Sequence, residues 1–195
     1  RSKRSFGYIM SEIQANKLSP SSGTAVQLGD SGDTFTIPSG ATITNSGTAT
    51  GFGEANTPNF FAKTSSQSIS ASTTTVVVYS SEDYDTSSLY DTSTGRFTVD
   101  ANTTGKYFFF ASVKYAASSI TRNNLALFKN GTETLRTEFG NSSTYPTVLV
   151  SGVINLSSAG DYVDARVTQN DGTKSLSGES EGNFFGGFRV TSWVH

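Results

Sequence analysis

Apolar residues in this chain recur mostly at alternate positions, in short runs separated by glycine, serine and asparagine. A period of two is typical of β-strands, and glycine- and asparagine-rich breaks are typical of turns. Val163, Ala165 and Val167 alternate with polar residues, which indicates a strand with one wetter face. Asn130-Gly131 lies between two apolar runs and predicts a two-residue type I′ hairpin turn.

The most apolar of the expected strands begins at Tyr107. The run Tyr107-Phe108-Phe109-Phe110 is apolar on both faces of a strand. Such a strand is typical of a position covered on both sides, within a sandwich or at a boundary between subunits. Gly186-Gly187, in the last aromatic run, predicts a bulge or the close approach of another backbone. The expected strands cover residues 60–63, a serine-rich stretch ending at 76–79, 96–99, 107–115, 125–129 paired with 133–137, 146–156, 161–168 and 183–193.

Residues 35–52 repeat with a period of six, in the hexads FTIPSG, ATITNS and GTATGF. Such a period is typical of short β-rungs in solenoids and prisms. Three hexads cannot bury a core alone, because each repeat contacts only its neighbours, but three chains wound together could. We therefore expect a β-rung stalk with Phe35, Ile37 and Ile43 in its core. The alternative is a chance alignment in a threonine-rich segment.

The first twenty residues place Phe6, Ile9, Met10 and Ile13 at roughly helical spacing and end at Pro20. One interpretation is a frayed tail, because termini are often poorly ordered. The other is an anchor that docks on a partner, since these apolar groups have no evident core of their own. The predicted organisation is an anchoring segment over residues 1–22, a stalk and connector over 23–58, and a head over 59–195.

Charge and composition exclude several classes of partner. The net charge of −2 and the pI near 5.4 give no basic footprint for nucleic acid or an anionic membrane. No apolar run approaches the roughly 18 residues of a membrane-spanning helix. Cysteine is absent, so stability must come from burial or from assembly. We expect neither a nucleic-acid nor a membrane partner.

The sequence shows no catalytic constellation. The only histidine is His195, so no Ser-His-Asp or Cys-His arrangement can be built on an interior histidine, and zinc spacing is impossible. Glu82, Asp83, Asp85 and Asp91 cluster, and such carboxylates could hydrolyse a glycoside or bind Ca²⁺. Their polar setting favours solvated loop charges instead. We expect no enzyme, no cofactor and no metal.

Five groups of residues occur in the order and spacing of one family. They are Tyr90-Asp91 with Thr94-Gly95-Arg96-Phe97-Thr98, Gly105-Lys106-Tyr107-Phe108-Phe109, Leu125-Ala126-Leu127-Phe128-Lys129-Asn130-Gly131, Val153-Ile154-Asn155-Leu156 with Gly160-Asp161-Tyr162-Val163, and Asn183-Phe184-Phe185-Gly186-Gly187-Phe188. With these groups, residues 59–190 resemble a C1q-like domain of the TNF-like jelly-roll superfamily. Many animal members carry a cysteine near the strand of Phe97, and this chain has none.

The resemblance implies an all-β, antiparallel two-sheet jelly-roll sandwich. It also implies a tight homotrimer, with aromatic residues of the inner sheet at the three-fold axis. On that basis we expect Tyr107, Phe109, Phe185 and Phe188 at the trimer interface. These aromatics could also fill the core of a monomeric sandwich.

Residues 32–53 resemble stalk segments of tailed-phage fibre and virion proteins. Together with the jelly roll, this implies a non-enzymatic virion structural protein of a bacteriophage: a trimeric fibre, spike or capsid-decoration subunit on the particle surface. Its N-terminus would dock to capsid or tail proteins, and its head could bind a host-surface glycan or protein through the loops at 80–89, 116–124, 138–145 and 170–181. The alternative is a secreted C1q-like recognition module that binds glycans or proteins.

Overall fold

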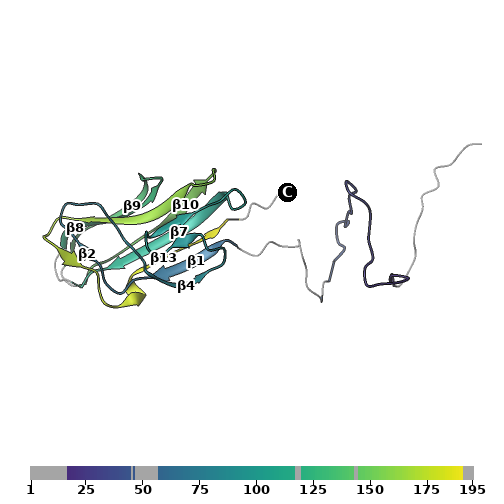
Figure 1. Cartoon of the computed structure of the whole chain (residues 1–195), viewed down its shortest axis with the longest axis horizontal. Coiled ribbons are helices and arrows are strands. Elements are labelled where there is room, and N and C mark those ends of the chain that lie inside the picture. The colour runs from purple at the N-terminus through teal and green to yellow at the C-terminus, as the bar shows by residue number, and fades with distance from the viewer. Residues whose placement is uncertain (1–16, 45, 47–56, 117–119, 143–144, 191–195) are drawn as a thin grey trace, which may run out of the picture. The chain divides into compact units, whose positions relative to one another are not determined.

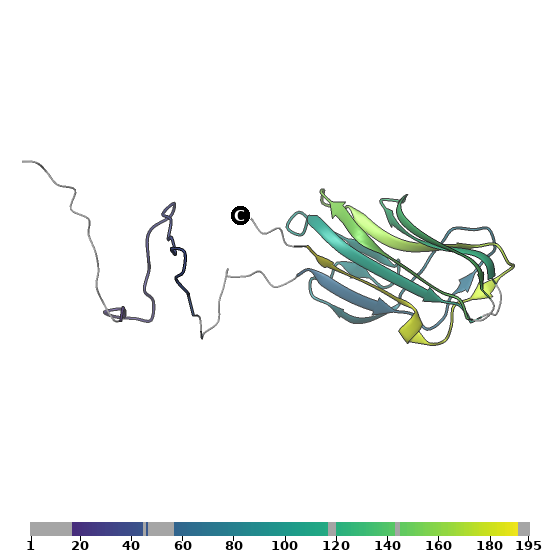
Figure 2. The same ribbon diagram turned by 180° about the vertical axis from the view of Figure 1, so that it is seen from behind.

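The computed structural model describes residues 17–44, 46, 57–116, 120–142 and 145–190. The chain divides into two units, residues 1–50 and 51–195. The described part of the second unit is all-β and consists of two facing antiparallel sheets (Figures 1 and 2). Within the described ranges, no helix has the length and apolar character needed to cross a membrane.

The first sheet has five strands in the order β10-β7-β13-β1-β4, with all neighbours antiparallel. Its strands are β1 (Asn59–Lys63), β4 (Ser81–Asp85), β7 (Gly105–Lys114), β10 (Thr147–Leu156) and β13 (Phe184–Arg189). The first residues of β1 pair with the last residues of β13, since Asn59 lies opposite Phe188. Both strands therefore reach the same end of the sandwich (Figure 1).

The second sheet has the strand order β5-β6-β11-β8-β9, and β3 pairs with β11 beside this path. Its strands are β3 (Thr75–Val76), β5 (Tyr90–Asp91), β6 (Arg96–Thr98), β8 (Ile120–Lys129), β9 (Thr132–Ser142) and β11 (Tyr162–Gln169). A short pair of β2 (Ser68–Ile69) with β12 (Lys174–Ser175) and the 3₁₀ turn η1 (Ser180–Gly182) complete the described elements. The chain crosses repeatedly between the two sheets, which is the jelly-roll arrangement expected from the sequence.

The core lies between the two sheets and is strongly aromatic. Phe60 of the first sheet stacks on Phe97 of the second, with ring centroids 4.8 Å apart. Phe185 meets the edge of the Phe60 ring at 5.0 Å, and Tyr107 lies 5.2 Å from Phe97. Such packed rings bury large apolar areas, and the geometry of the ring pairs adds stability beyond that of the buried area. In a protein without cysteine, this cluster is a major source of stability.

The serine-rich strand expected to end at residues 76–79 is reduced to the short strands β2 and β3. The amide side chain of Gln67 explains why the ladder stops. Its Nε2 donates to the carbonyl of Val76 at 2.7 Å, and its Oε1 accepts from the amide of Val78 at 2.8 Å. The Val77 amide between these two groups donates to the Ala165 carbonyl of β11, so Gln67 satisfies the backbone only on the side of the segment that faces away from β11, and no further strand is required there.

The hairpin turn expected at Asn130-Gly131 is present between β8 and β9. Both residues have positive φ, +50° and +78°, as a type I′ turn requires. The side chain of Asn130 also fixes the turn to β11. Its Nδ2 donates to Oδ1 of Asp161 at 2.7 Å, and its Oδ1 accepts from the amide of Tyr162 at 2.9 Å.

Asp161 makes the stability of this turn dependent on pH. The Asn130 amide and the Lys129 ammonium, 3.0 Å from Oδ2, lower the pKa of Asp161 to about 2. Because the pKa is lower in the folded than in the unfolded chain, the stabilisation is present above about pH 4 and is lost as the pH falls toward 2. We expect the free energy of unfolding of Asp161→Asn to fall less between pH 7 and 2.5 than that of the unaltered chain, as measured by urea unfolding. Parallel curves for the two proteins would contradict this assignment.

The described part of the first unit, residues 17–44, contains no strand or helix in the single chain. The side chains of Phe35, Ile37 and Ile43, which we expected in the core of a β-rung stalk, are exposed there. Leu18, Val26 and Leu28 of the same segment are exposed as well. The described part of the chain thus provides little cover for these apolar groups. The expected docking residues Phe6, Ile9, Met10 and Ile13 lie outside the described residues.

Candidate functional site: an aromatic face on the five-stranded sheet

Strand β7 presents aromatic rings on both of its faces. Tyr107 and Phe109 point into the sandwich and have no exposed surface. Burial raises the pKa of Tyr107 to about 12, and its hydroxyl donates to the carbonyl of Thr103. Phe108 and Phe110 alternate with them and lie half-buried on the opposite side of the sheet. A β-strand alternates its side chains between faces, so β7 contributes equally to the core and to the outer surface.

Neighbouring strands extend the outer set of rings across the sheet. The members are half-buried or exposed aromatics from four adjacent strands, and we call them the outer aromatic face: Phe61, Tyr84, Phe108, Phe110, Phe184 and Phe188. Phe188 lies directly opposite Phe108 in the ladder, with ring centroids 5.4 Å apart. Phe61 stacks on Phe184 at 5.7 Å. The rings therefore form one contiguous surface.

The two glycines of β13 allow rings of β7 to lie close against this strand on both sides. A Cβ on Gly186 would come within 2.6 Å of the Phe110 ring on the outer face. A Cβ on Gly187 would come within 2.6 Å of the Phe109 ring in the core. The sequence predicted a bulge or the close approach of another backbone at this pair; backbone oxygens of Phe60 and Phe108 would lie 3.0 Å from the added Cβ atoms, but the nearest atoms belong to the two rings. The close approach of the rings fixes Phe110 on the outer surface and Phe109 in the interior.

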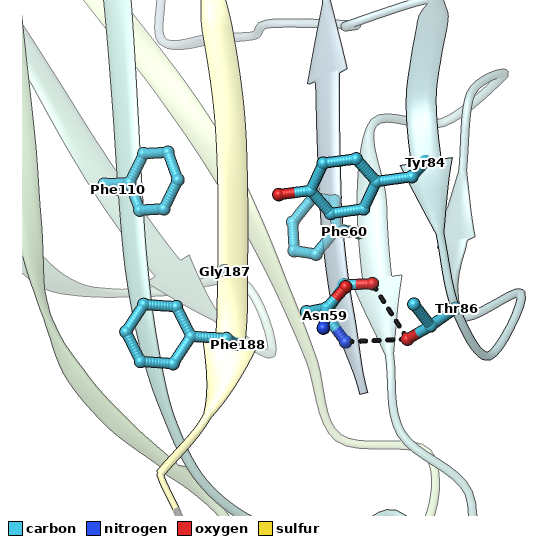
Figure 3. Close-up of a pocket in the computed structure, with 7 residues that line it drawn as sticks. All are labelled: Asn59, Phe60, Tyr84, Thr86, Phe110, Gly187 and Phe188. Atoms are coloured by element: carbon cyan, nitrogen blue, oxygen red, sulfur yellow. Dashed lines mark hydrogen bonds between the residues drawn. The ribbon is translucent and has the colours of Figure 1, made fainter. Parts of the chain in front are cut away.

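A hollow of about 450 Å³ opens on the outer aromatic face. Figure 3 shows the rings of Phe110 and Phe188 on one side of it and Tyr84 on the other, with the backbone of Gly187 between them. At its lower edge, the amide of Asn59 donates to the hydroxyl of Thr86 at 3.0 Å, and this hydroxyl donates to the Asn59 carbonyl at 3.2 Å. The hollow is thus walled mainly by aromatic carbon.

Strand β10 adds apolar side chains at the border of this surface. Leu149 and Val153 are 50% and 54% exposed, and their ladder positions place them on the outer side, opposite Ser112 and Phe108. A contiguous apolar patch of this kind is uncommon on a monomeric protein and marks a surface that another molecule covers. The geometry provides apolar area for association.

The outer face of the six-stranded sheet has a different chemistry. Its centre is Asp164, whose side chain is fully buried beneath two arginines. Arg166 donates to both oxygens of Asp164, at 2.6 and 3.0 Å, and its guanidinium lies over the Phe128 ring. Arg96 lies 3.5 Å from the same carboxylate and over the Tyr162 ring. On this face the central carboxylate is therefore paired with two arginines, which also lie over the rings of Phe128 and Tyr162.

The acidic residues near β4 have structural roles. Asp83 pairs with Lys63 at 2.6 Å. Asp85 accepts from the amides of Ser87 and Tyr90, at 3.1 and 2.7 Å. Asp91 accepts from Ser93 and Thr94 in its turn, and these hydrogen bonds lower its pKa to about 2. In the part of the chain that the structure describes, no group of three or more such side chains could hold a metal ion.

Three of the four expected interface residues lie in the core of a single chain. Tyr107, Phe109 and Phe185 have 0% exposed surface within a single chain, so their side chains form the core and have no surface to offer a second chain. Phe188 alone of the four expected residues lies on the outer aromatic face. Sequence reasoning missed Phe61, Phe108, Phe110 and Phe184 as surface residues, although alternation from Phe188 would have selected Phe184.

The domain is a jelly-roll sandwich with one aromatic outer face, and comparison with known proteins gives its family. The C1q domain model matches residues 59–190, and the chain therefore belongs to the C1q domain family. This confirms the resemblance of residues 59–190 to a C1q-like domain. No curated protein matches the chain at a significant level.

Several solved structures are similar to this chain, including two that align with TM-scores above 0.5. Murine APRIL at pH 8.0 aligns with a TM-score of 0.53 and 17% identity, over 68% of this chain and 98% of that one. Eiger TNF from S. frugiperda aligns with a TM-score of 0.51 and 15% identity, over 70% and 94% of the two chains. The globular domain of the zebrafish complement 1qA protein aligns at 0.49 with 19% identity, over 70% and 99%. C1q/TNF domains are typically non-enzymatic binding modules.

Proposed function

We propose that this protein is a homotrimer whose subunits associate through the outer aromatic face, and that it serves as a non-enzymatic virion structural protein of a bacteriophage. The observation that carries the proposal is the contiguous apolar surface of Phe61, Phe108, Phe110, Phe184 and Phe188, whose rings are only half-buried in a single chain. C1q/TNF domains typically form homotrimers, and the outer aromatic face supplies the apolar area that such an association needs.

The N-terminal unit supports the same assembly for a separate reason. Phe35 and Ile43 are 67% and 53% exposed in a segment without strands, so the single chain gains nothing from their burial. The hexad period would allow three chains to cover these groups in a common stalk. In the proposed protein, the segment before this stalk docks to capsid or tail proteins. The trimeric head is displayed from the particle surface as a fibre, spike or decoration, where it can bind a host-surface glycan or protein.

Immunogold electron microscopy tests the virion role. We expect antibodies against the head to label phage particles purified from a culture that produces the protein. Removal of residues 1–22 should abolish this labelling, because the proposed anchor would be lost, while the solution mass of the released protein stays that of a trimer. Particles that carry no label, with the protein recovered only in the free fraction, would contradict the virion role.

The family match by itself also supports a second candidate, a secreted recognition module that binds glycans or proteins. This candidate shares the trimeric head and differs in its location. Recovery of the protein from the medium without any particle would favour it.

A further inference from the structure

Tyr145 has an unusual backbone conformation on an exposed segment. Its φ is +43°, a region that bulky L-residues rarely adopt, and 57% of its surface is exposed. The backbone just after it is fixed, since Pro146 is buried and its carbonyl accepts from the amide of Tyr115 at 3.0 Å. Strained residues of this kind persist where the surrounding structure imposes them, and they concentrate at ligand-binding sites.

A charged pair lies beside the Tyr145 ring. The ammonium of Lys114, at the end of β7, is 5.9 Å from the ring centroid and pairs with the carboxylate of Glu179. Gly182 leaves room for Lys114, because a Cβ on residue 182 would lie 2.8 Å from carbon atoms of the Lys114 side chain. An ammonium over an aromatic ring is favourable, so Lys114 is held between the ring and the carboxylate.

Asn183 fixes the loop that carries Glu179. This side chain is fully buried, and its Nδ2 donates to the carbonyls of Ser177 and Glu179, at 3.0 and 3.1 Å. Its Oδ1 accepts from the amide of Lys114 at 2.8 Å. One buried amide therefore holds both members of the charged pair in register, which is the type of support that a preorganised binding site needs.

These groups lie at the end of the sandwich opposite the start of β1. Because β1 and β7 are both antiparallel to β13, they run in the same direction, and Lys114 lies at the same end as Lys63. A hollow of about 320 Å³ adjoins η1 there, lined by Lys63, Asp83 and hydroxyl-bearing residues that include Ser81 and Ser180. This end is therefore opposite the end of the sandwich at which Asn59 lies.

We infer that Tyr145, Lys114 and Glu179 form a binding site for a neutral oligosaccharide. The exposed face of Tyr145 offers a flat ring against which the C–H face of a pyranose can stack. The Lys114 ammonium donates hydrogen bonds to sugar hydroxyls, and the Glu179 carboxylate accepts them. The two charges cancel, so the site favours an uncharged ligand. The inference deepens the proposed function, because it names the ligand class that a displayed head would take.

Binding of the full chain to an array of neutral oligosaccharides, comprising maltotriose, cellotriose, chitotriose and lactose, tests the inference. We expect the unaltered chain to bind at least one of these sugars. The affinity of Tyr145→Asn for that sugar should be at least tenfold lower. Asparagine tolerates positive φ, so this variant should melt at the same temperature as the unaltered chain or higher. Glu179→Gln should also weaken binding. Phe139→Asn and Glu181→Gln, which change exposed residues outside the site, should leave binding unchanged.

Two results would overturn the inference: no binding by the full chain at millimolar sugar, or unchanged binding by both Tyr145→Asn and Glu179→Gln. The solution mass of each variant separates this failure from that of the proposed function. A trimer that binds none of the sugars overturns the inference and leaves the assembly standing. A monomer that binds sugar through Tyr145 supports the inference and contradicts the assembly.

Discussion

A chain that begins at Asn59 and carries Phe188→Glu should be a folded monomer at concentrations where the same shortened chain without the substitution is a trimer. Phe188 is half-buried on the outer aromatic face, and its only ring contact within the described part of the chain is with Phe108, so the fold of one subunit tolerates its loss. In the trimer, the change removes an aromatic anchor and places three carboxylates in an apolar interface. We expect the free energy of association to weaken by about 2–4 kcal/mol per subunit, enough to dissociate the trimer at micromolar concentration. Sedimentation velocity measures the change.

The matched control is Phe139→Glu, which introduces the same charge at an exposed aromatic residue of β9 in the other sheet. This variant should remain a trimer. Circular dichroism should show β-structure in both proteins. If Phe188→Glu stays a trimer, or if both variants dissociate to the same extent, the outer aromatic face is not the interface.

Gly187→Val should have the largest effect on stability. The new Cβ would lie 2.6 Å from the ring of Phe109 and 3.0 Å from the carbonyl oxygen of Phe108. The ring is fully buried and the carbonyl is backbone, so neither can move without disturbing the core. We expect destabilisation by about 3 kcal/mol, at the upper end for overpacked sites, measured by urea unfolding of the trimer and of the Phe188→Glu monomer.

Gly140→Ala is the corresponding control. The new methyl group would meet only the carbonyl oxygen of Thr121, at 3.7 Å, and Gly140 lies in an exposed strand of the other sheet. Its free energy of unfolding should change by less than about 0.5 kcal/mol. Equal destabilisation by the two substitutions would show that the Gly187 backbone matters for some reason other than the packing of Phe109.

Much of the fold could be predicted from local pattern and turn chemistry. The type I′ turn at Asn130-Gly131 and the antiparallel jelly roll are confirmed, because asparagine and glycine tolerate positive φ and alternation identifies strands. The predicted lengths of the strands were less accurate. The β8–β9 hairpin runs from Ile120 to Ser142, beyond the expected 125–137, since its outer part is polar and gives no hydrophobic signal.

Strand β4 was missed for a similar reason. Its sequence, SEDYD, has four polar residues and one aromatic, which is typical of a loop, yet it pairs with β1 at the edge of the sheet. An edge strand needs only one partner, and its acidic side chains prevent pairing with a further chain. Tertiary pairing therefore decides its structure, and local propensity does not.

The side of each aromatic residue could not be obtained from the sequence. In Tyr107-Phe108-Phe109-Phe110 both alternating sets are apolar, so a period of two does not show which set points inward. The structure decides this through contacts distant in sequence: Phe109 packs on Gly187, and Phe110 packs on Gly186. This is why three of the four expected interface residues belong to the core.

Light scattering of the full chain, and of a shortened chain that begins at Asn59, tests the central claim most directly. If the outer aromatic face drives assembly, both proteins have a mass near three chains, about 62 kDa for the full one from a chain mass of 20.6 kDa. A trimer that is lost on shortening would assign assembly to the N-terminal segment. A monomeric mass for both proteins would contradict the assembly and the display role built on it.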